Sequence, residues 1–124
     1  MVEDNADFRR SIREMLSGVF PLIIFDEAPD GELALAQVGE CCPDLILMDI
    51  GLPGENGLEI TRKIKAAYPH IPVLILTDHD LDDYRQAAFQ YGADSFLTKD
   101  VPFQEIAQSV GSILKIVPYP EIPG

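Results

Sequence analysis

Two short apolar runs restrict the possible folds of this chain more than any other feature of its sequence. They are Asp44-Leu45-Ile46-Leu47-Met48 and Ile71-Pro72-Val73-Leu74-Ile75-Leu76. Both runs are rich in aliphatic residues and bounded by turn residues, so we predict that each forms a strand buried on both faces. Strands of this kind are typical of parallel sheets, whose two faces are covered by helices.

Helical segments alternate with these strands along the chain. Apolar residues recur at helical spacing over 8–19, 60–67, 84–91 and 103–117, a less clearly marked helix lies over 30–40, and weaker strand signals lie over 22–25 and 95–97. The alternation predicts the α/β class, with a doubly wound, five-stranded parallel sheet in the flavodoxin-like order 2-1-3-4-5. Only Met1 and Val2 precede the first acidic residues, so we expect a truncated first strand.

The length and composition indicate one domain. A chain of 124 residues can bury a sizeable core without the support of a metal or a disulfide. We predict that the domain covers residues 1–116 and that the Pro-rich segment 117–124 is a tail or linker. No uncharged apolar run approaches the roughly 20 residues that span a bilayer, and no signal segment opens the chain. We therefore expect a cytoplasmic protein that does not bind a membrane.

The charge of the chain argues against binding of nucleic acid by this domain itself. Acidic residues outnumber basic ones 21 to 9, which gives a formal charge of -12. A charge of this sign opposes the phosphate backbone of a nucleic acid. An acidic excess can also serve solubility alone, so the more specific question is whether some of the carboxylates lie together.

Polar residues follow the predicted strands at the points where ligands bind in a doubly wound sheet. These residues are Glu3, Asp4, Asp49, Thr77 and Lys99. Because the carboxyl ends of parallel strands share one edge of the sheet, we expect three carboxylates, a hydroxyl and an amine to meet there. Crowded carboxylates repel one another unless they are protonated or bridged by a hard cation, and their oxygens suit Mg²⁺. With the metal bound, one carboxylate can act as a nucleophile towards a phosphoryl group.

Four stretches at these strand ends resemble the response regulator receiver domain family. They are Val2-Glu3-Asp4-Asn5, residues 49–59, Leu76-Thr77 and residues 92–100. Each stretch is a weak signal alone, but their order at the strand ends is specific, and the resemblance covers residues 1–115. Asp100, at a position where many members have Pro, is similar to the NarL/LuxR-type branch, whose members carry a helix-turn-helix output domain after the receiver.

The resemblance implies a role for each residue of the predicted site. Asp49 would be the phosphoacceptor, Asp4 a direct metal ligand and Glu3 a ligand acting through water. The main-chain carbonyl of Gly51 would be a further metal ligand, and Lys99 would pair with the phosphoryl oxygens. Thr77 and Phe96 would form the switch. Pro53 and Gly57 would shape the loop around the pocket, and we expect a positive φ at Gly57.

The same resemblance implies a signalling function. A sensor histidine kinase or a phosphotransfer protein would supply the phosphoryl group in the presence of Mg²⁺, and the domain would be a regulatory phosphoacceptor rather than an enzyme, able at most to catalyse its own phosphorylation and dephosphorylation. Phosphorylation would change the surface formed by 81–91, the strand through Phe96 and 102–115, and so control an output domain or partner, with transcription as the expected process. We expect the phosphorylated form to dimerise through this surface.

Two other functions compete with this interpretation. Taken singly, Asp49, Thr77 and Lys99 could be ordinary capping or surface residues. The chain could also be a receiver-like interaction module that is never phosphorylated, which Asp78 and the short start favour. The presence of Glu3, Asp4, Asp49, Thr77 and Lys99 together argues against it. A flavodoxin-like carrier would share the architecture, but it needs a phosphate-binding loop rich in Ser, Thr and Gly after the first strand. Glu3 and Asp4 stand at that point and would repel a flavin phosphate.

Asp78 departs from the family pattern, in which a small residue usually follows the switch threonine. We predict that its carboxylate lies within about 6 Å of the incoming phosphoryl charge and slows phosphorylation. The alternative is that Asp78 or Asp80 caps the following helix with its side chain turned to solvent.

Overall fold

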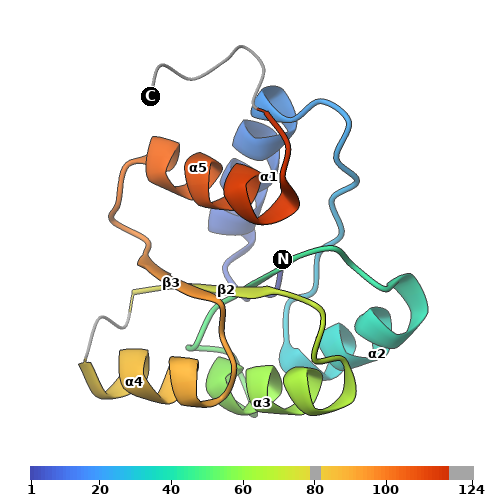
Figure 1. Ribbon diagram of the computed structural model, residues 1–124, viewed down its shortest axis with the longest axis vertical. Helices are drawn as coiled ribbons and strands as arrows, with labels where there is room; N and C mark the ends of the chain where they lie inside the picture. Colours follow the sequence, from blue (N-terminus) through green and yellow to red (C-terminus); the bar gives the residue numbers. More distant parts are fainter. Residues whose placement is uncertain (79–81, 118–124) are drawn as a thin grey trace.

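A computed structural model describes residues 1–78 and 82–117 of the chain (Figure 1). Its elements are α1 (Ala6–Val19), α2 (Gly31–Cys41), β1 (Ile46–Met48), α3 (Gly57–Ala67), β2 (Val73–Thr77), α4 (Asp82–Gln90), β3 (Ser95–Thr98) and α5 (Phe103–Leu114). From α2 onwards, helices and strands alternate as predicted, and the weakly marked helix over 30–40 is present as α2. Apart from Val117, the predicted tail over 117–124 lies outside the described residues, as does the first residue of the helix predicted over 81–91.

The sheet is parallel and has three strands in the order β1-β2-β3 in the described part of the chain. Val2 extends it through two isolated parallel bridges, one to Met48 and one to Ala28. The spatial order Ala28, Val2, β1, β2, β3 corresponds to the predicted order 2-1-3-4-5. The prediction of five strands is wrong in number, because the first two are reduced to single bridges.

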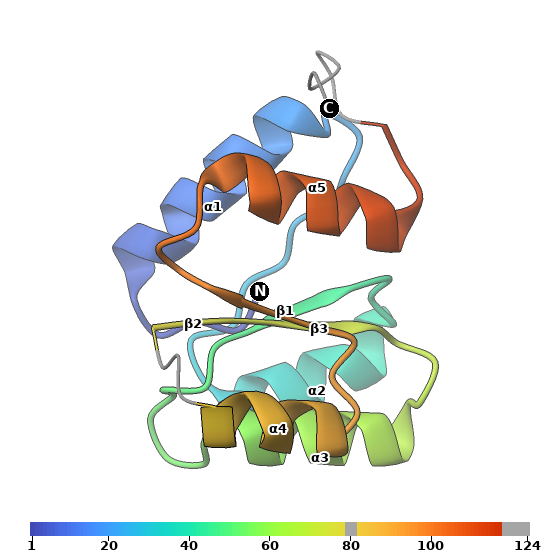
Figure 2. The same ribbon diagram turned by 60° about the vertical axis from the view of Figure 1, so that its left-hand side comes forward.

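The sheet lies between two layers of helices. Figures 1 and 2 show α1 and α5 on one face and α2, α3 and α4 on the other. The side chains of Leu47, Leu74 and Leu76 belong to the apolar core under α1 and α5. Their neighbours in the strands, such as Met48 and Ile75, belong to the core on the opposite face. Successive residues of a strand point to opposite faces, and both faces are buried here, which explains why the strands read as continuous apolar runs.

The strand predicted over 22–25 is absent. Leu22 and Ile24 are 95% and 90% exposed, whereas Ile23 and Phe25 pack against the core under α1 and α5. An extended segment needs a neighbouring backbone to form a ladder, and the neighbour here consists only of Met1 and Val2, which pair with Asp26 and Ala28. A cavity of about 880 Å³ lies beside this segment, lined in part by Met1, Phe20, Leu45 and Leu47.

Side-chain caps fix the starts of three helices. Asn5 Oδ1 accepts hydrogen bonds from the main-chain N–H groups of Asp7 and Phe8 at the start of α1. Asp30 caps α2 and Asn56 caps α3 in the same manner. Such caps typically stabilise a helix by about 1 kcal/mol. They also place α1 directly after Glu3 and Asp4, and α3 directly after the loop that follows Asp49. Within the described residues, no helix combines the length and apolarity that a membrane span requires.

Candidate functional site

The residues predicted from the strand ends meet at one edge of the sheet. Asp49 directly follows β1, Thr77 is the last residue of β2, and Lys99 directly follows β3. The main-chain N–H of Lys99 donates to the carbonyl oxygen of Thr77 at 2.9 Å. The side chain of Lys99 turns into the site, where its Nζ lies 2.5 Å from Glu3 Oε1 and 3.4 Å from Asp49 Oδ2.

The three acidic residues form a group with the dimensions of a metal site. One carboxylate oxygen from each of Glu3, Asp4 and Asp49 can be chosen so that all three lie within 4.8 Å of one another. Glu3 and Asp49 are buried, and Asp4 is exposed, so the group opens to solvent on the side of Asp4. In the part of the chain that the structure describes, the buried Asp49 Oδ1 makes no hydrogen bond. An all-oxygen group with an unpartnered buried oxygen fits a hard divalent cation.

Burial and charge together determine the protonation of this group. Burial raises the pKa of Glu3 to about 7, and the charge of Asp49 adds to the rise against the opposing effects of Lys99 and the Asn5 N–H. Burial lowers the pKa of Lys99, but the hydrogen bond and charge of Glu3 and the charges of Asp49 and Asp78 raise it by more. Lys99 is therefore firmly cationic, and Glu3 changes its charge near neutral pH.

Two aromatic rings contact cations at the site. The ring of Phe8 lies under Lys99, with Nζ 4.5 Å from the ring centre. The helical spacing over 8–19 predicts only that Phe8 lies on the apolar face of a helix; its position one turn after the acidic pair was the available signal for a role at the site. Phe96 is buried, and the guanidinium of Arg85 lies 4.7 Å from its ring centre. The predicted switch aromatic thus points inwards in this structure.

Asp78 faces the site although its side chain is 77% exposed. Its Oδ2 lies 4.0 Å from Lys99 Nζ, which agrees with the predicted approach to the pocket. The described part of α4 starts at Asp82, directly after residues 79–81, which lie outside the described residues, so the predicted cap at Asp78 stays an alternative. Asp80, the other predicted cap, lies outside the described residues.

The loop after Asp49 corrects the prediction for Gly57. Positive φ values occur at Gly54 and Gly92, and Gly57 is not among the residues with positive φ. The reason for glycine at position 57 is close approach, since a Cβ there would lie 1.8 Å from the main-chain oxygen of Asp49. Gly51 and Pro53 are exposed in the same loop, and their proposed parts in metal binding and pocket shape remain predictions.

Comparison with known proteins identifies the family. The family model described as "Response regulator receiver domain" matches residues 1–111 of this chain. The response regulator GacA of Pseudomonas viridiflava is 34% identical over 110 residues, which cover 89% of this chain and 51% of GacA. The DNA-binding transcriptional activator DevR/DosR of Mycobacterium tuberculosis is 30% identical over 91% of this chain and 52% of its own length. The chain thus spans about half the length of these relatives.

Solved structures show the same fold. The signal receiver domain of the putative response regulator NarL from Mycobacterium tuberculosis has a TM-score of 0.84 and 30% identity, with 91% of each chain covered. A two-component response regulator of the LuxR family from Aurantimonas sp. SI85-9A1 has a TM-score of 0.84 and 30% identity, over 92% of this chain and 81% of that one. With the acidic group at the strand ends and a family match over almost the whole length, the chain belongs to the response regulator receiver domain family, whose members are regulatory phosphoacceptors rather than enzymes.

Proposed function

We propose that Asp49 accepts a phosphoryl group from a sensor histidine kinase or a phosphotransfer protein. The observation that carries this proposal is the unpartnered, buried Oδ1 of Asp49 beside two further carboxylates. An oxygen of Asp49 would attack the phosphorus, the bond between phosphorus and the donor's imidazole nitrogen would break, and the imidazole would leave with the bonding electrons. Asp49 would then carry an acyl phosphate.

Glu3, Asp4 and Asp49 would hold Mg²⁺ for this reaction, together with the main-chain carbonyl of Gly51. When bound, Mg²⁺ would neutralise charge on the phosphoryl oxygens. Lys99 already contacts Asp49 Oδ2, so a small movement of its amine away from Glu3 would bring it to a phosphoryl oxygen. Thr77, fully buried at the end of β2, would offer its hydroxyl to another.

Phosphorylation is expected to act through the surface formed by α4, β3 and α5. Thr77 pairs with Thr98 in the sheet, and Phe96 lies within the same strand β3. A shift of Thr77 towards the phosphoryl group would therefore displace β3 and the helices beside it. We propose that the phosphorylated form dimerises through this surface and controls an output segment that regulates transcription, as the names of the relatives suggest. In that arrangement, residues 1–116 are the receiver and 117–124 a linker.

Intact-mass spectrometry tests the phosphoacceptor. Acetyl phosphate or phosphoramidate with Mg²⁺ should add one phosphoryl group to the wild type and to Asp44→Asn, which removes an exposed carboxylate just before β1. Asp49→Asn should gain none, and a chelator should stop the reaction of the wild type. An acid-stable, base-labile phosphate on Asp49→Asn would show that the acceptor is another residue, and a gain unaffected by the chelator would exclude the metal role.

A receiver-like interaction module that is never phosphorylated is the second candidate. The contact of Asp78 with Lys99 favours it, because an added negative charge beside the site opposes an incoming phosphoryl group. Sedimentation with and without beryllofluoride, a phosphoryl mimic, separates the two functions. The first function predicts a mass that doubles with the mimic, and the second predicts no effect of the mimic at any concentration.

A further inference from the structure

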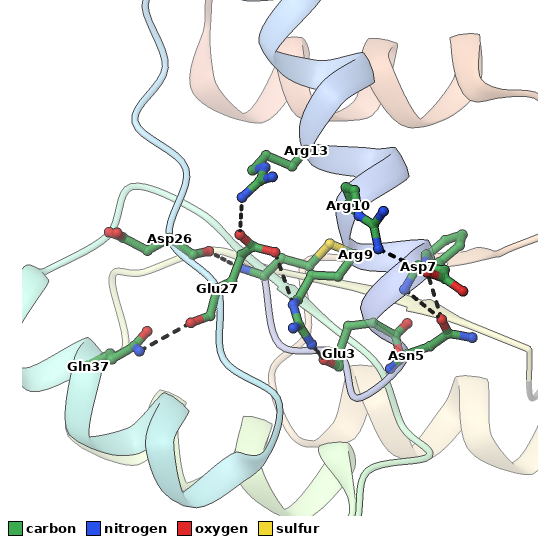
Figure 3. A network of polar contacts seen from close by, with 11 residues as sticks. Glu3, Asn5, Asp7, Arg9, Arg10, Arg13, Asp26, Glu27 and Gln37 are labelled. Atoms are coloured by element: carbon green, nitrogen blue, oxygen red, sulfur yellow. Dashed lines mark hydrogen bonds and ion pairs between the residues drawn. The ribbon is translucent and has the colours of Figure 1, made fainter.

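A guanidinium on α1 connects the acidic pair to the segment before α2 (Figure 3). Arg9 Nη1 donates to the main-chain oxygen of Glu3 at 2.6 Å, and Arg9 Nε donates to Glu27 Oε1 at 3.0 Å. The other oxygen of that carboxylate, Glu27 Oε2, accepts from Arg13 Nη1 at 2.7 Å. Gln37 Nε2 of α2 donates to the main-chain oxygen of Glu27 at 3.2 Å. Arg9 and Glu27 thus join three separate segments of the chain.

The backbone near Glu3 has little other support from the sheet. Within the described residues, Val2 makes one bridge on each side, and the N–H of Glu3 donates to the oxygen of Ala28 at 3.0 Å. Beyond that point the chain leaves the sheet and turns into α1. The bond from Arg9 is made to the carbonyl that directly follows, so it fixes the peptide plane between Glu3 and Asp4. The orientation of that plane sets the directions of both carboxylates.

Burial separates this contact from the ordinary ion pairs of the surface. The side chains of Arg9 and Glu27 are 19% and 24% exposed. By contrast, Arg10 pairs with Asp7 on the same helix, with exposures of 58% and 91%. Exposed pairs contribute little to structure, whereas a partly buried carboxylate held by two guanidinium groups has a defined geometry.

We propose that Arg9, held by Glu27, is a positioning residue that aims Glu3 and Asp4 at a divalent cation. This inference rests on the proposed function in one respect, namely that the cation serves phosphorylation of Asp49. Arg9 touches the Glu3 main chain and not the carboxylates of the group, so its effect is geometric. Mg²⁺ demands nearly ideal octahedral geometry, and loss of groups that orient its ligands typically weakens metal binding by about 10- to 100-fold.

The Mg²⁺ affinity of the full chain, measured by titration with Mg²⁺ alone and monitored by two-dimensional NMR, tests the proposal without a phosphodonor. Arg9→Gln should weaken Mg²⁺ binding about tenfold. Arg10→Gln carries the same change in net charge and leaves the bonds of Arg9 to the Glu3 carbonyl and to Glu27 in place, so it should stay within about twofold of the wild type. Arg9→Lys keeps the charge but cannot reach both acceptors with one amine, and it should weaken binding nearly as much as Arg9→Gln.

The result for Glu27 separates positioning from folding. Glu27→Gln keeps an oxygen that can accept from Arg9, so its Mg²⁺ affinity should lie between those of the wild type and Glu27→Ala. The proposal is overturned if Arg9→Gln melts at a lower temperature but binds Mg²⁺ like the wild type, and also if Arg10→Gln weakens binding equally. If Arg9→Gln fails to fold, the Mg²⁺ affinities of the two Glu27 variants decide instead: Glu27→Gln should bind more tightly than Glu27→Ala, and equal affinities would overturn the proposal.

Phosphorylation at saturating Mg²⁺ separates this inference from the proposed function. The acceptor activity of Arg9→Gln should then return to within about twofold of the wild type, because metal occupancy has been restored. A wild type that binds Mg²⁺ with the predicted dependence on Arg9, yet takes no phosphoryl group, would refute the proposed function and leave the positioning role intact. A wild type that does not bind Mg²⁺ would refute the positioning role.

Discussion

The amine of Lys99 lies closer to Glu3 than to Asp49, at 2.5 Å from Glu3 Oε1 and 3.4 Å from Asp49 Oδ2. In the unphosphorylated domain, the lysine therefore neutralises mainly the most deeply buried carboxylate of the group. Glu3 is 1% exposed, and an ionised carboxylate at that depth is costly without a cation. A bound metal can replace the lysine as the partner of Glu3, which frees the amine for the phosphoryl oxygens.

The protonation of Glu3 makes the stability of the metal-free domain depend on pH. Because burial raises the pKa of Glu3 from 4.5 to about 7, the folded state retains a proton that the unfolded state has lost between these pH values. Stability should therefore fall as pH rises from about 4.5 to about 7, by at most about 1.4 kcal/mol per pH unit. Urea unfolding of the wild type and Glu3→Gln from pH 5 to pH 8 measures this. The fall should be smaller in Glu3→Gln, and parallel curves would contradict the assignment to Glu3.

The affinity for Mg²⁺ should change with pH in the opposite direction to the stability of the metal-free domain. A metal ligand must be deprotonated, so Mg²⁺ affinity should rise with pH through about 7 and then level off. NMR titrations at pH 6, 7 and 8 measure the affinity directly, and an affinity independent of pH over this interval would mean that Glu3 is not a ligand.

Replacement of Asp78 should speed phosphorylation. Its carboxylate lies 4.0 Å from Lys99 Nζ, where it competes for the amine and repels an incoming phosphoryl group. Two unit charges about 6 Å apart repel by roughly 3 kcal/mol at an effective dielectric near 20, and the exposure of Asp78 reduces this to about a third or less. Asp78→Ala should therefore react several-fold faster with acetyl phosphate. Asp82→Ala, an exposed acidic residue of α4, controls for net charge, and an equal rate in both variants would remove the specific role of Asp78.

A methyl group at position 57 should disrupt the loop that holds the phosphoacceptor. In Gly57→Ala the new Cβ would lie 1.8 Å from the main-chain oxygen of Asp49, so the backbone of one segment must move. We expect a loss of more than about 3 kcal/mol in unfolding free energy or a site that no longer binds Mg²⁺. Gly18→Ala in α1 is the matched control, because its Cβ meets nothing within 4 Å, and it should stabilise the domain by up to about 1 kcal/mol. Equal effects in urea unfolding would contradict the close approach.

Lengthening the first strand should stabilise the domain. The cavity of about 880 Å³ beside Met1, Leu45 and Leu47 lies next to the edge of β1, where Val2 makes its only bridge to that strand. Four or five apolar residues placed ahead of Val2 should continue the pairing with β1 and fill this space. The melting temperature should rise by several degrees, whereas a Gly-Ser extension of equal length should leave it unchanged. Equal melting temperatures would contradict the continued pairing with β1.

The linear sequence determined the parallel sheet and the composition of the site. Apolar runs such as 71–76, bounded by turn residues, predict buried strands. Residues that follow such strands, among them Asp49 and Lys99, are then expected at one edge of a parallel sheet. These inferences need only local periodicity and the geometry of parallel sheets. The resemblance to receiver domains rested on the same residues, and the family match over 1–111 confirms it.

Contacts between distant segments decided what the sequence could not. The segment 22–25 has the composition of a strand, but a strand exists only where a partner backbone is present, and Met1 and Val2 supply too little of one. Position 57 requires glycine because the main-chain carbonyl of Asp49 lies close to it. No local sequence pattern predicts this contact. Similarly, the ion pair of Lys99 with Glu3 depends on side chains brought together by folding. The same holds for the contacts of Arg9 with Glu27 and with the Glu3 carbonyl. Pairing and close approach are properties of tertiary structure because the energy of each contact depends on where its partner lies.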